Sequence, residues 1–342
     1  MLDLICRNPP CTDGFRHQIL LPESGTILCR KQDIYMEKEA SSNNVDFSVI
    51  IPQRNSIQTL PRLFNSIPVS DRIEIIVVDN TPTPVTKEEI GVERDYKLLW
   101  SEPSRHAGGA RNVGLEAATG KWLIFSDADD YFTEGAFDLF QKQLNTQADI
   151  VFFKSTGIYT DTGEYSDRAE PYSKMIIDYL EKEDELSLRI KHIVPWAKMI
   201  RHSLVKENSI TFDEVRAAND AMFATKAGLL AKSISAIDAD AYVVTVSSGS
   251  LTKRRDFEVL HSRYLVALRR NQLLKSEKLG KHQAMVIHFL YQSREYGFSK
   301  LWMMLKEAWQ YKQNIFINTQ KLFPGFKRFL KNERKNAKYI VK

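Results

Sequence analysis

The densest group of chemically active side chains in this sequence is a set of carboxylates that follows an apolar run. Asp127, Asp129 and Asp130 fall within four positions, directly after the segment 122–126, WLIFS. Carboxylates this close repel one another, and their pKa values rise unless a cation lies near them. Hard oxygen ligands suit Mg²⁺ or Mn²⁺, which usually complete their shells with waters and substrate phosphates. The Asp127-x-Asp129 pair therefore predicts a metal site that holds a diphosphate, whereas Asp130 is better explained as a helix cap or supporting group.

Alternating strands and helices are predicted to position these carboxylates. Pro52 ends the first predicted strand, and Gly120 can end the helix that the Gly-rich segment 107–120 begins. Strands that alternate with helices at this spacing predict an α/β fold, a mostly parallel, Rossmann-like sheet with helices on both faces. The predicted strands are 47–51, 73–79, 96–100, 122–126 and 148–155, and the predicted helices lie within 60–67, 107–120 and 136–144.

Polar side chains follow several of these strands at the point where each one ends. Ligands bind at the carboxyl ends of the strands in parallel α/β sheets, so these groups predict an active site at one sheet edge. The groups are Gln53, Arg54 and Asn55 after the first strand, Asp79 and Asn80 after the second, and Asp127, Asp129 and Asp130 after 122–126.

Four segments resemble the nucleotide-sugar-binding half of a family 2 glycosyltransferase with the GT-A fold. They are FSVIIPQRN (47–55), EIIVVDN (74–80), GGARNVGLEAATGKW (108–122) and FSDADD (125–130), in the order and at the separations usual for that family. A further block, 194–228, resembles the family's Trp-x-Lys element followed by its Glu-Asp motif. Here that motif reads Asn219-Asp220, so an amide replaces the first acid. The resemblance covers roughly residues 46–255.

The resemblance implies an inverting enzyme of the hexosyltransferase type, of the kind found in bacterial surface polysaccharide synthesis. Such an enzyme moves a sugar from a nucleotide-sugar donor, most commonly a UDP-sugar, to a hydroxyl of a saccharide or lipid-linked acceptor. It also implies Mn²⁺ or Mg²⁺ on Asp127 and Asp129. Asp220 is the implied general base, because the attacking hydroxyl must lose a proton in a single displacement. Taken in isolation, Asp220 would be better explained as an acid in the first turn of a helix, where the macrodipole stabilises it.

The remaining site residues follow from the same resemblance. Arg54 and His106 are equally well explained as loop residues, and Lys198 as a solvated charge. Trp196 is interpreted as a wall of the cleft, with a core residue as the alternative. The residues expected to bind the nucleotide-sugar are Pro52, Arg54, Asp79, Asn80, Arg105, His106, Arg111 and Asp127, and those expected to contact acceptor or phosphate are Trp196 and Lys198.

Charge is distributed unevenly along the chain. Residues 251–342 hold 21 Lys and Arg against 6 Asp and Glu, a net charge of +15, although the whole chain carries only +5. We therefore expect three regions: an N-terminal extension and linker (1–45), a GT-A domain (46–250) and a basic helical C-terminal region (251–342). Basic helices that also carry aromatic residues suit an anionic membrane surface, and they equally suit packing on the catalytic domain. No nucleic-acid partner is expected, because no nucleic-acid-binding module accompanies the basic region.

The sequence contains no apolar run of transmembrane length and no recognisable export signal. Together with a sparse, odd number of cysteines (Cys6, Cys11 and Cys29), this predicts a cytoplasmic protein, with the inner membrane face as a peripheral location. Those thiols with His17 match no recognised zinc-site spacing.

Three other functions compete with glycosyl transfer. A non-catalytic protein of the same fold is supported only by Asn219. A sugar-1-phosphate nucleotidyltransferase requires a Gly-rich phosphate loop after the first strand, and that position reads PQRNS. A nucleic-acid-binding protein would need no divalent metal and would bind with a steep salt dependence.

Overall fold

The computed structural model describes residues 45–246 and 256–318. All of these residues belong to a single unit of the chain, Asn43–Lys342. The N-terminal extension with its three cysteines, and the basic segments 251–255 and 319–342, lie outside the described residues. The strands are β1 (Phe47–Gln53), β2 (Ile73–Asp79), β3 (Lys97–Trp100), β4 (Trp122–Phe125), β5 (Tyr131–Phe132), β6 (Ile150–Tyr159), β7 (Lys198–Arg201) and β8 (Ile234–Val246). The α-helices are α2 (Leu60–Asn65), α3 (Lys87–Ile90), α4 (His106–Ala117), α5 (Ala136–Lys142), α6 (Glu170–Lys182), α7 (Glu185–Lys191), α8 (His202–Glu207), α9 (Ala221–Leu230), α10 (Phe257–Ser276), α11 (Val286–Ser293) and α12 (Phe298–Gln310).

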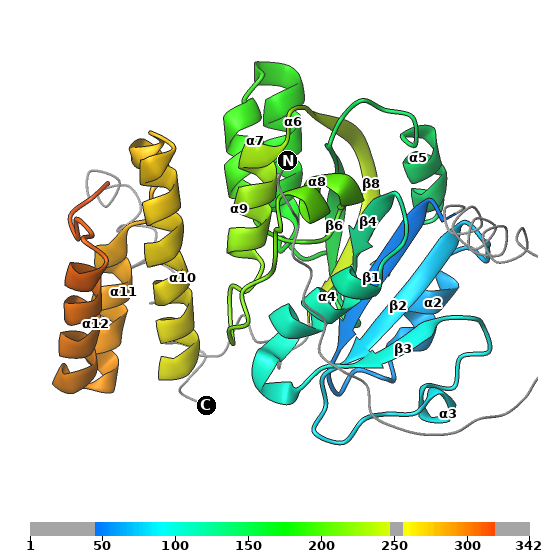
Figure 1. Ribbon diagram of the computed structural model, residues 1–342, viewed down its shortest axis with the longest axis horizontal. Coiled ribbons are helices and arrows are strands. Elements are labelled where there is room, and N and C mark those ends of the chain that lie inside the picture. Colours follow the sequence, from blue (N-terminus) through cyan, green and yellow to red (C-terminus); the bar gives the residue numbers. More distant parts are fainter. Residues whose placement is uncertain (1–44, 247–255, 319–342) are drawn as a thin grey trace, which may run out of the picture. The chain divides into compact units, whose positions relative to one another are not determined.

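All eight strands form one sheet in the order β3-β2-β1-β4-β7-β6-β8-β5 (Figure 1). The half that contains β3, β2, β1 and β4 is parallel, as predicted. The other half is mixed, because β7 lies antiparallel between β4 and β6 while β6 and β8 are parallel. This is the α/β arrangement of the GT-A fold, with the carboxyl ends of β1, β2 and β4 at a single edge.

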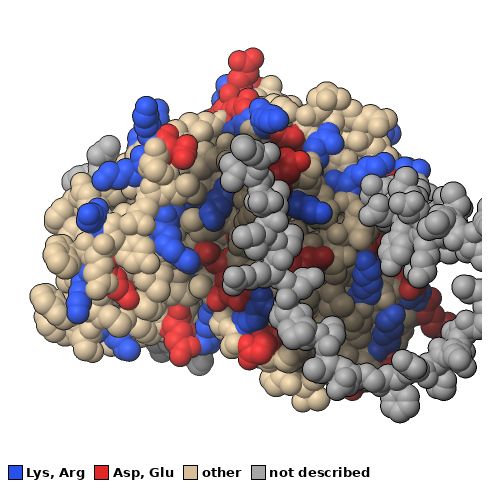
Figure 2. Space-filling model, viewed as in Figure 1, with Lys and Arg blue, Asp and Glu red and all other residues tan. Residues whose placement is uncertain are grey.

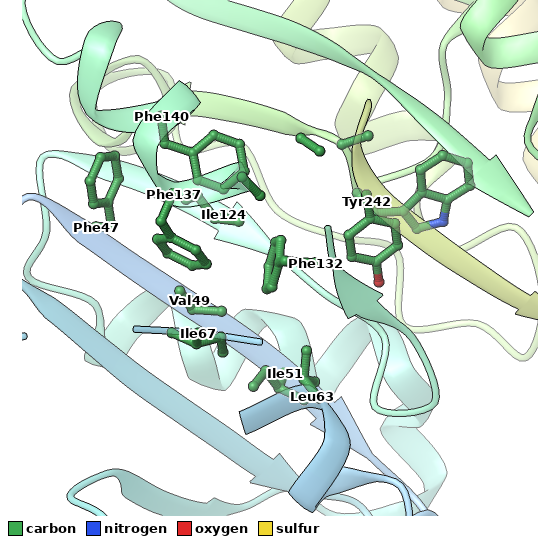
Figure 3. Close-up of a cluster of buried hydrophobic side chains, with 14 of the residues drawn as sticks. Phe47, Val49, Ile51, Leu63, Ile67, Ile124, Phe132, Phe137, Phe140 and Tyr242 are labelled. Carbon is green, nitrogen blue, oxygen red and sulfur yellow. The ribbon is translucent and has the colours of Figure 1, made fainter. Parts of the chain in front are cut away.

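Both faces of the sheet are covered by helices. Side chains alternate between the faces along each strand, so Val49 and Ile51 of β1 join one buried cluster and Ile50 joins the other. The first cluster packs against α2 and α5 and is rich in aromatic rings, including Phe132, Phe137 and Phe140 (Figure 3). Helices α4, α6, α7, α8 and α9 supply buried side chains to the second cluster. This two-sided burial explains why the strands read as nearly continuous apolar runs.

The position of Pro52 differs from the prediction that it ends the first strand. β1 continues to Gln53, and Pro52 pairs with Val78 of β2. Its pairing with β4 stops at Ile50, so one side of the strand is open where proline lacks an N–H group. The proline therefore interrupts no ladder of hydrogen bonds and is tolerated inside the strand.

The described part of the basic C-terminal region is helical, as predicted. α10, α11 and α12 share a small core of their own, formed by Tyr264, Leu268, Val286, Leu290, Met304 and Ala308. Among the described residues, none of the helices has the length and apolar character needed to cross a membrane.

Candidate functional site

Arg111 of α4 joins the two acidic motifs that the sequence singles out. One guanidinium nitrogen donates to Oδ1 of Asp127 at 2.6 Å, and another donates to Oδ1 of Asn219 at 2.7 Å. The side chain is 5% exposed and lies over the ring of Phe212, 5.4 Å from its centroid. A buried cation between an acid and an amide holds both in place, because losing the acid would leave its charge unpaired and losing the amide would leave a buried N–H group without an acceptor. The loop after β4 and the loop before α9 therefore meet at Arg111.

The Asp127 loop rests on two buried aromatic residues. The backbone N–H of Asp127 donates to the hydroxyl of Tyr242 at 2.9 Å, and Tyr242 is fully buried. The Tyr242 ring stacks on Trp196, with ring centroids 5.6 Å apart. Trp196 is only 3% exposed, so it is a core residue and not a wall of the cleft. Its contribution to the site is to support Tyr242, which holds the Asp127 backbone.

Asp129 and Asp130 have different environments although they are adjacent. Asp130 is buried and accepts a hydrogen bond from the backbone N–H of Thr245 at 2.7 Å. Asp129 is exposed at the surface, yet enough protein surrounds its carboxylate that burial, and then the charge of Asp127, raises its pKa to about 6. Within 45–246 and 256–318, no other residue donates a hydrogen bond to that carboxylate. Asp130 therefore supports the loop, whereas Asp129 is exposed and its charged form is disfavoured by burial and by Asp127.

The Asp127–Asp129 pair fits a divalent cation that the substrate also ligates. Arg111 occupies Oδ1 of Asp127, and the side chain remains 35% exposed. No group of three or more His, Cys, Asp and Glu residues in the described segments could enclose a metal ion. Two carboxylates completed by waters and phosphate oxygens are the usual arrangement for Mg²⁺. Burial and the charge of Asp127 raise the pKa of Asp129 although the positive charge of Arg62 acts in the opposite direction, so a further cation at this pair would stabilise the charged carboxylate.

Asp220 occupies the N-cap position of α9 without acting as a cap. Its side chain makes no capping hydrogen bond. Burial raises its pKa, opposed mainly by the positive charge of Arg111, while the charge of Asp127 raises it further. A carboxylate whose pKa is raised, and which makes no hydrogen bond to the helix, is suited to accept a proton.

The loop 212–220 that carries Asp220 is fastened to α4. The Asn112 amide exchanges two hydrogen bonds with the backbone of Phe212, at 2.8 and 3.0 Å. Arg105 forms a two-pronged ion pair with Glu214, at 2.6 and 2.9 Å. Gly108 lies so close to the loop that an added Cβ would stand 2.0 Å from the carbonyl oxygen of Asp213. The glycine in the Gly-rich segment therefore permits close helix–loop contact.

Helix α10 fastens the same loop from its other side. The Ser262 hydroxyl donates to the carbonyl of Ala217 at 2.9 Å and accepts from its N–H at 3.0 Å. Arg269 pairs with Asp213 at 2.9 Å. Ala218, which follows Ala217 in the loop, has φ = 59°, a left-handed conformation that is unfavourable for alanine. The contacts from α10 hold the loop in this strained turn immediately before Asn219 and Asp220.

The predicted nucleotide residues Asp79 and Asn80 lie at the expected edge but are occupied by protein groups. Asp79 is 1% exposed and accepts hydrogen bonds from Gln53 at 2.8 Å, from Thr81 and from the backbone of Val85. Asn80 is also buried, and its amide donates to backbone carbonyls of the segment that precedes α4. In this structure both side chains hold the strand-end loops in place.

The other predicted nucleotide residues lie around that edge. Arg54 is exposed, and Arg105 is engaged with Glu214. His106 has φ = 55° and ψ = −166°, a region that is essentially restricted to glycine. Burial, and then the charges of Arg54 and Arg216, lower its pKa. His106 therefore combines a strained backbone with an imidazole whose pKa is lowered, at the start of α4.

Lys198 is a buried cation close to Asp220. It is 3% exposed, donates to the carbonyl of His192 at 2.9 Å and lies over the Phe152 ring, 5.0 Å from its centroid. Burial lowers its pKa to about 7, and the negative charge of Asp220 acts in the opposite direction. The alternative of a solvated lysine does not describe this residue. The sequence analysis also missed Tyr242, Ser262 and Arg269, for which single residue types carry no distinctive signal.

Residues 48–208 match the family model described as "Glycosyl transferase family 2". The poly(ribitol-phosphate) beta-N-acetylglucosaminyltransferase TarS of Staphylococcus aureus is 28% identical over 276 residues, which are 74% of this chain and 46% of TarS. A poly(ribitol-phosphate) beta-glucosyltransferase of Bacillus spizizenii is 30% identical over 59% of this chain and 32% of the relative. The matched part of this chain thus spans about half the length of TarS and about a third of the second relative.

The same similarity is visible in solved structures. The crystal structure of residues 1–349 of S. aureus TarS in complex with UDP is 26% identical, with a TM-score of 0.53, and the match covers 75% of this chain and 73% of that one. A second TarS structure, in complex with UDP-GlcNAc, has a TM-score of 0.52 at 22% identity and supports the fold.

Proposed function

Residues 48–208 form a glycosyl transferase family 2 domain with the GT-A fold, and on this premise we propose that the chain is an inverting glycosyltransferase. The proposed reaction moves a sugar from a nucleotide-sugar to a hydroxyl group of a saccharide or lipid-linked acceptor. The observation that carries the proposal is the convergence of Asp127 and the Asn219-Asp220 pair on Arg111. Donor-side and acceptor-side groups must lie this close if a hydroxyl is to attack the sugar in one displacement.

We propose a UDP-sugar donor, because the similar TarS structures are described as complexes with UDP and UDP-GlcNAc. Asp127 and Asp129 would hold Mn²⁺ or Mg²⁺, which offsets the charge of the departing nucleoside diphosphate. The Arg111 guanidinium keeps the Asp127 carboxylate oriented through its hydrogen bond to Oδ1, at 2.6 Å. Arg54 and His106 lie beside the same edge and are the proposed contacts to base or phosphate, together with Pro52, Asp79, Asn80 and Arg105.

Asp220 is the proposed general base. Its raised pKa makes it a stronger proton acceptor than an ordinary aspartate, while Arg111 keeps the charged form accessible. Lys198 lies close enough for its charge to act on Asp220, so we propose that it tunes this carboxylate rather than contacting substrate directly. The two similar enzymes named above act on poly(ribitol-phosphate), which is a hydroxyl-bearing polymer.

A non-catalytic nucleotide-sugar-binding protein is the second candidate, and Asn219 favours it. An amide stands where the family usually has an acid. In this chain, however, the Asn219 carbonyl oxygen accepts from Arg111 at 2.7 Å, which is a contact that a carboxylate would also make. The replacement therefore keeps the hydrogen bond while removing one negative charge from the neighbourhood of Asp220.

Nucleotide binding tests the proposed function directly. We expect UDP, but not GDP or CDP, to raise the melting temperature of the protein in the presence of Mn²⁺, and calorimetry to give a Kd that weakens when the metal is chelated. Release of UDP from a panel of UDP-sugars would then identify the donor. The absence of nucleotide binding with either metal would reject the transferase proposal. Binding without any release or transfer would favour the non-catalytic alternative.

The contact between Ser262 and Ala217 gives a prediction for α10. Ser262→Ala should lower kcat about tenfold, because about 1.4 kcal/mol of loop positioning is lost with the two hydrogen bonds. The Kd for UDP should not change, because the hydroxyl contacts the loop that carries the proposed base and none of the residues proposed to bind the nucleotide. Ser276→Ala is the matched control, since Ser276 also lies in α10 but its hydroxyl bonds only to Leu273. Equal effects of both substitutions, or a weakened Kd for UDP, would contradict the positioning role.

A further inference from the structure

Helix α12 exposes an aromatic stripe in addition to its buried face. Phe298, Trp302 and Trp309 are 77%, 63% and 79% exposed. With about 100° of rotation per residue, their three side chains lie within about 40° of one another around the helix axis. The core-facing side of the helix is separate and is marked by buried Met304 and Ala308. Single exposed aromatic residues are common on protein surfaces, but an aligned set of three marks an interaction surface.

The charges around this aromatic stripe are predominantly basic. Residues 256–318 hold 10 Lys and Arg against 5 Asp and Glu, and the 24 residues that follow hold 8 against 1. Lys306 lies one helical turn after Trp302 and therefore flanks the stripe. Figure 2 shows the visible surface over α10–α12 as largely uncharged, with scattered basic side chains and fewer acidic ones. A partner for this face should therefore have an anionic surface, to meet the basic side chains, and an apolar layer below that surface, to receive the aromatic rings.

We propose that the aromatic stripe of α12 docks the protein on the surface of an anionic lipid bilayer. Tryptophan and phenylalanine prefer the boundary between headgroups and acyl chains, and a flanking lysine can reach the lipid phosphates. The basic chain that continues beyond residue 318 would add attraction of the same sign. Helix α12 has 13 residues, fewer than the about 20 that a spanning helix needs, so the proposed contact lies in the plane of the bilayer surface.

A second copy of the chain is a poorer occupant of the aromatic stripe. The three rings together offer roughly 450 Å², whereas a stable interface uses about 800 Å² on each partner. A twofold-symmetric contact would also place each basic flank against its own copy. The basic segment 319–342 meets the same objection, because its charge has the same sign as the surface around the stripe.

Vesicle flotation of the full chain tests this docking surface. We expect the protein to bind vesicles of phosphatidylcholine and phosphatidylglycerol far better than phosphatidylcholine alone, and to dissociate as salt is added. The double substitution Trp302→Ser, Trp309→Ser should weaken binding at least about tenfold, and Lys306→Glu about fivefold or more. Tyr165→Ser is the matched control, because Tyr165 is an aromatic residue outside α12 that is 63% exposed. It should bind as the wild type does.

Three outcomes would overturn the proposal. They are failure of the wild-type chain to bind anionic vesicles, equal binding by the double variant, and association of the chain in lipid-free solution that the double variant abolishes. The second outcome would assign vesicle binding to the basic chain alone, and the third would assign the stripe to a second copy. Binding is measured without nucleotide, so its result is independent of the proposed transferase activity. An unchanged melting temperature of the double variant in lipid-free solution provides the check that its fold is intact.

Discussion

Asp220→Asn is expected to lower kcat by roughly a thousandfold, the middle of the range for loss of a general base. The amide keeps the shape of the side chain but cannot accept the proton of the attacking hydroxyl. The Kd for UDP with metal should remain within about twofold, because Asp220 is not a proposed metal ligand. Measurement of kcat and of the Kd for UDP on the same preparation separates chemistry from binding. A variant that keeps more than a tenth of the activity would remove Asp220 from the mechanism.

The pH dependence provides an independent check on Asp220. Burial raises its pKa, so activity should fall with decreasing pH at a higher pH than an ordinary aspartate would produce. That limb should be absent from the residual activity of Asp220→Asn. A raised folded-state pKa also means that the fold loses stability as pH rises through that value, since the unfolded chain releases the proton more readily. The Asn variant should therefore melt at a higher temperature than the wild type at pH 7, and not in acid.

Asp184 offers a matched control, because it occupies the same position on another helix. It is the N-cap of α7, and its carboxylate does accept a hydrogen bond from the backbone of Ser187. Asp184→Ala should lower the free energy of unfolding by about 1 kcal/mol and leave kcat unchanged. Asp220→Ala should instead raise the free energy of unfolding and lower kcat. Loss of stability in both variants would return Asp220 to an ordinary capping role.

Asp129→Asn is expected to abolish the effect of metal on nucleotide binding. Loss of a supporting residue at a metal site weakens metal affinity by roughly 10–100-fold, and loss of a carboxylate ligand should weaken it at least as much. Calorimetric titration of UDP with and without Mn²⁺ should give the same weak Kd for this variant. Glu134→Gln is the charge-matched control, because Glu134 is an exposed acid that follows β5. A normal response to Mn²⁺ in Asp129→Asn would exclude Asp129 as a ligand.

The same substitution should stabilise the metal-free protein at neutral pH. The folded-state pKa of Asp129 is about 6, against an ordinary value of 3.8. The protonated carboxyl therefore favours the fold in acid, and this contribution is lost as pH rises from about 4 through about 6. Thermal melts should show a higher midpoint for Asp129→Asn at pH 7.5 and equal midpoints near pH 4. A lower midpoint at neutral pH would mean that the charged carboxylate has stabilising partners in the fold.

Local patterns in the sequence determined the parallel half of the sheet and the edge where the site lies. The apolar runs of β1, β2 and β4 are buried on both faces, and such burial leaves a continuous signal within a few neighbouring residues. The Gly-rich start of α4 is equally local, and the carboxylates that follow β4 could be read directly. The antiparallel strand β7 was not predicted, because its four residues are too few to show a periodic pattern. Its place between β4 and β6 in the sheet, and its direction there, depend on the path of the chain.

The roles of single polar and aromatic residues were decided by the tertiary structure. Trp196 and Lys198 have residue types that suit either a cleft or a core, and only packing shows that both are 3% exposed. The link from Arg111 to Asn219 joins positions 108 residues apart, and the hold of Ser262 on Ala217 comes from outside the matched family segment. A pattern of residue types specifies which face of a strand or helix is buried. Which distant side chains then meet depends on how those faces pack against one another. That packing is determined by all the elements of the fold together and not by any local stretch of sequence.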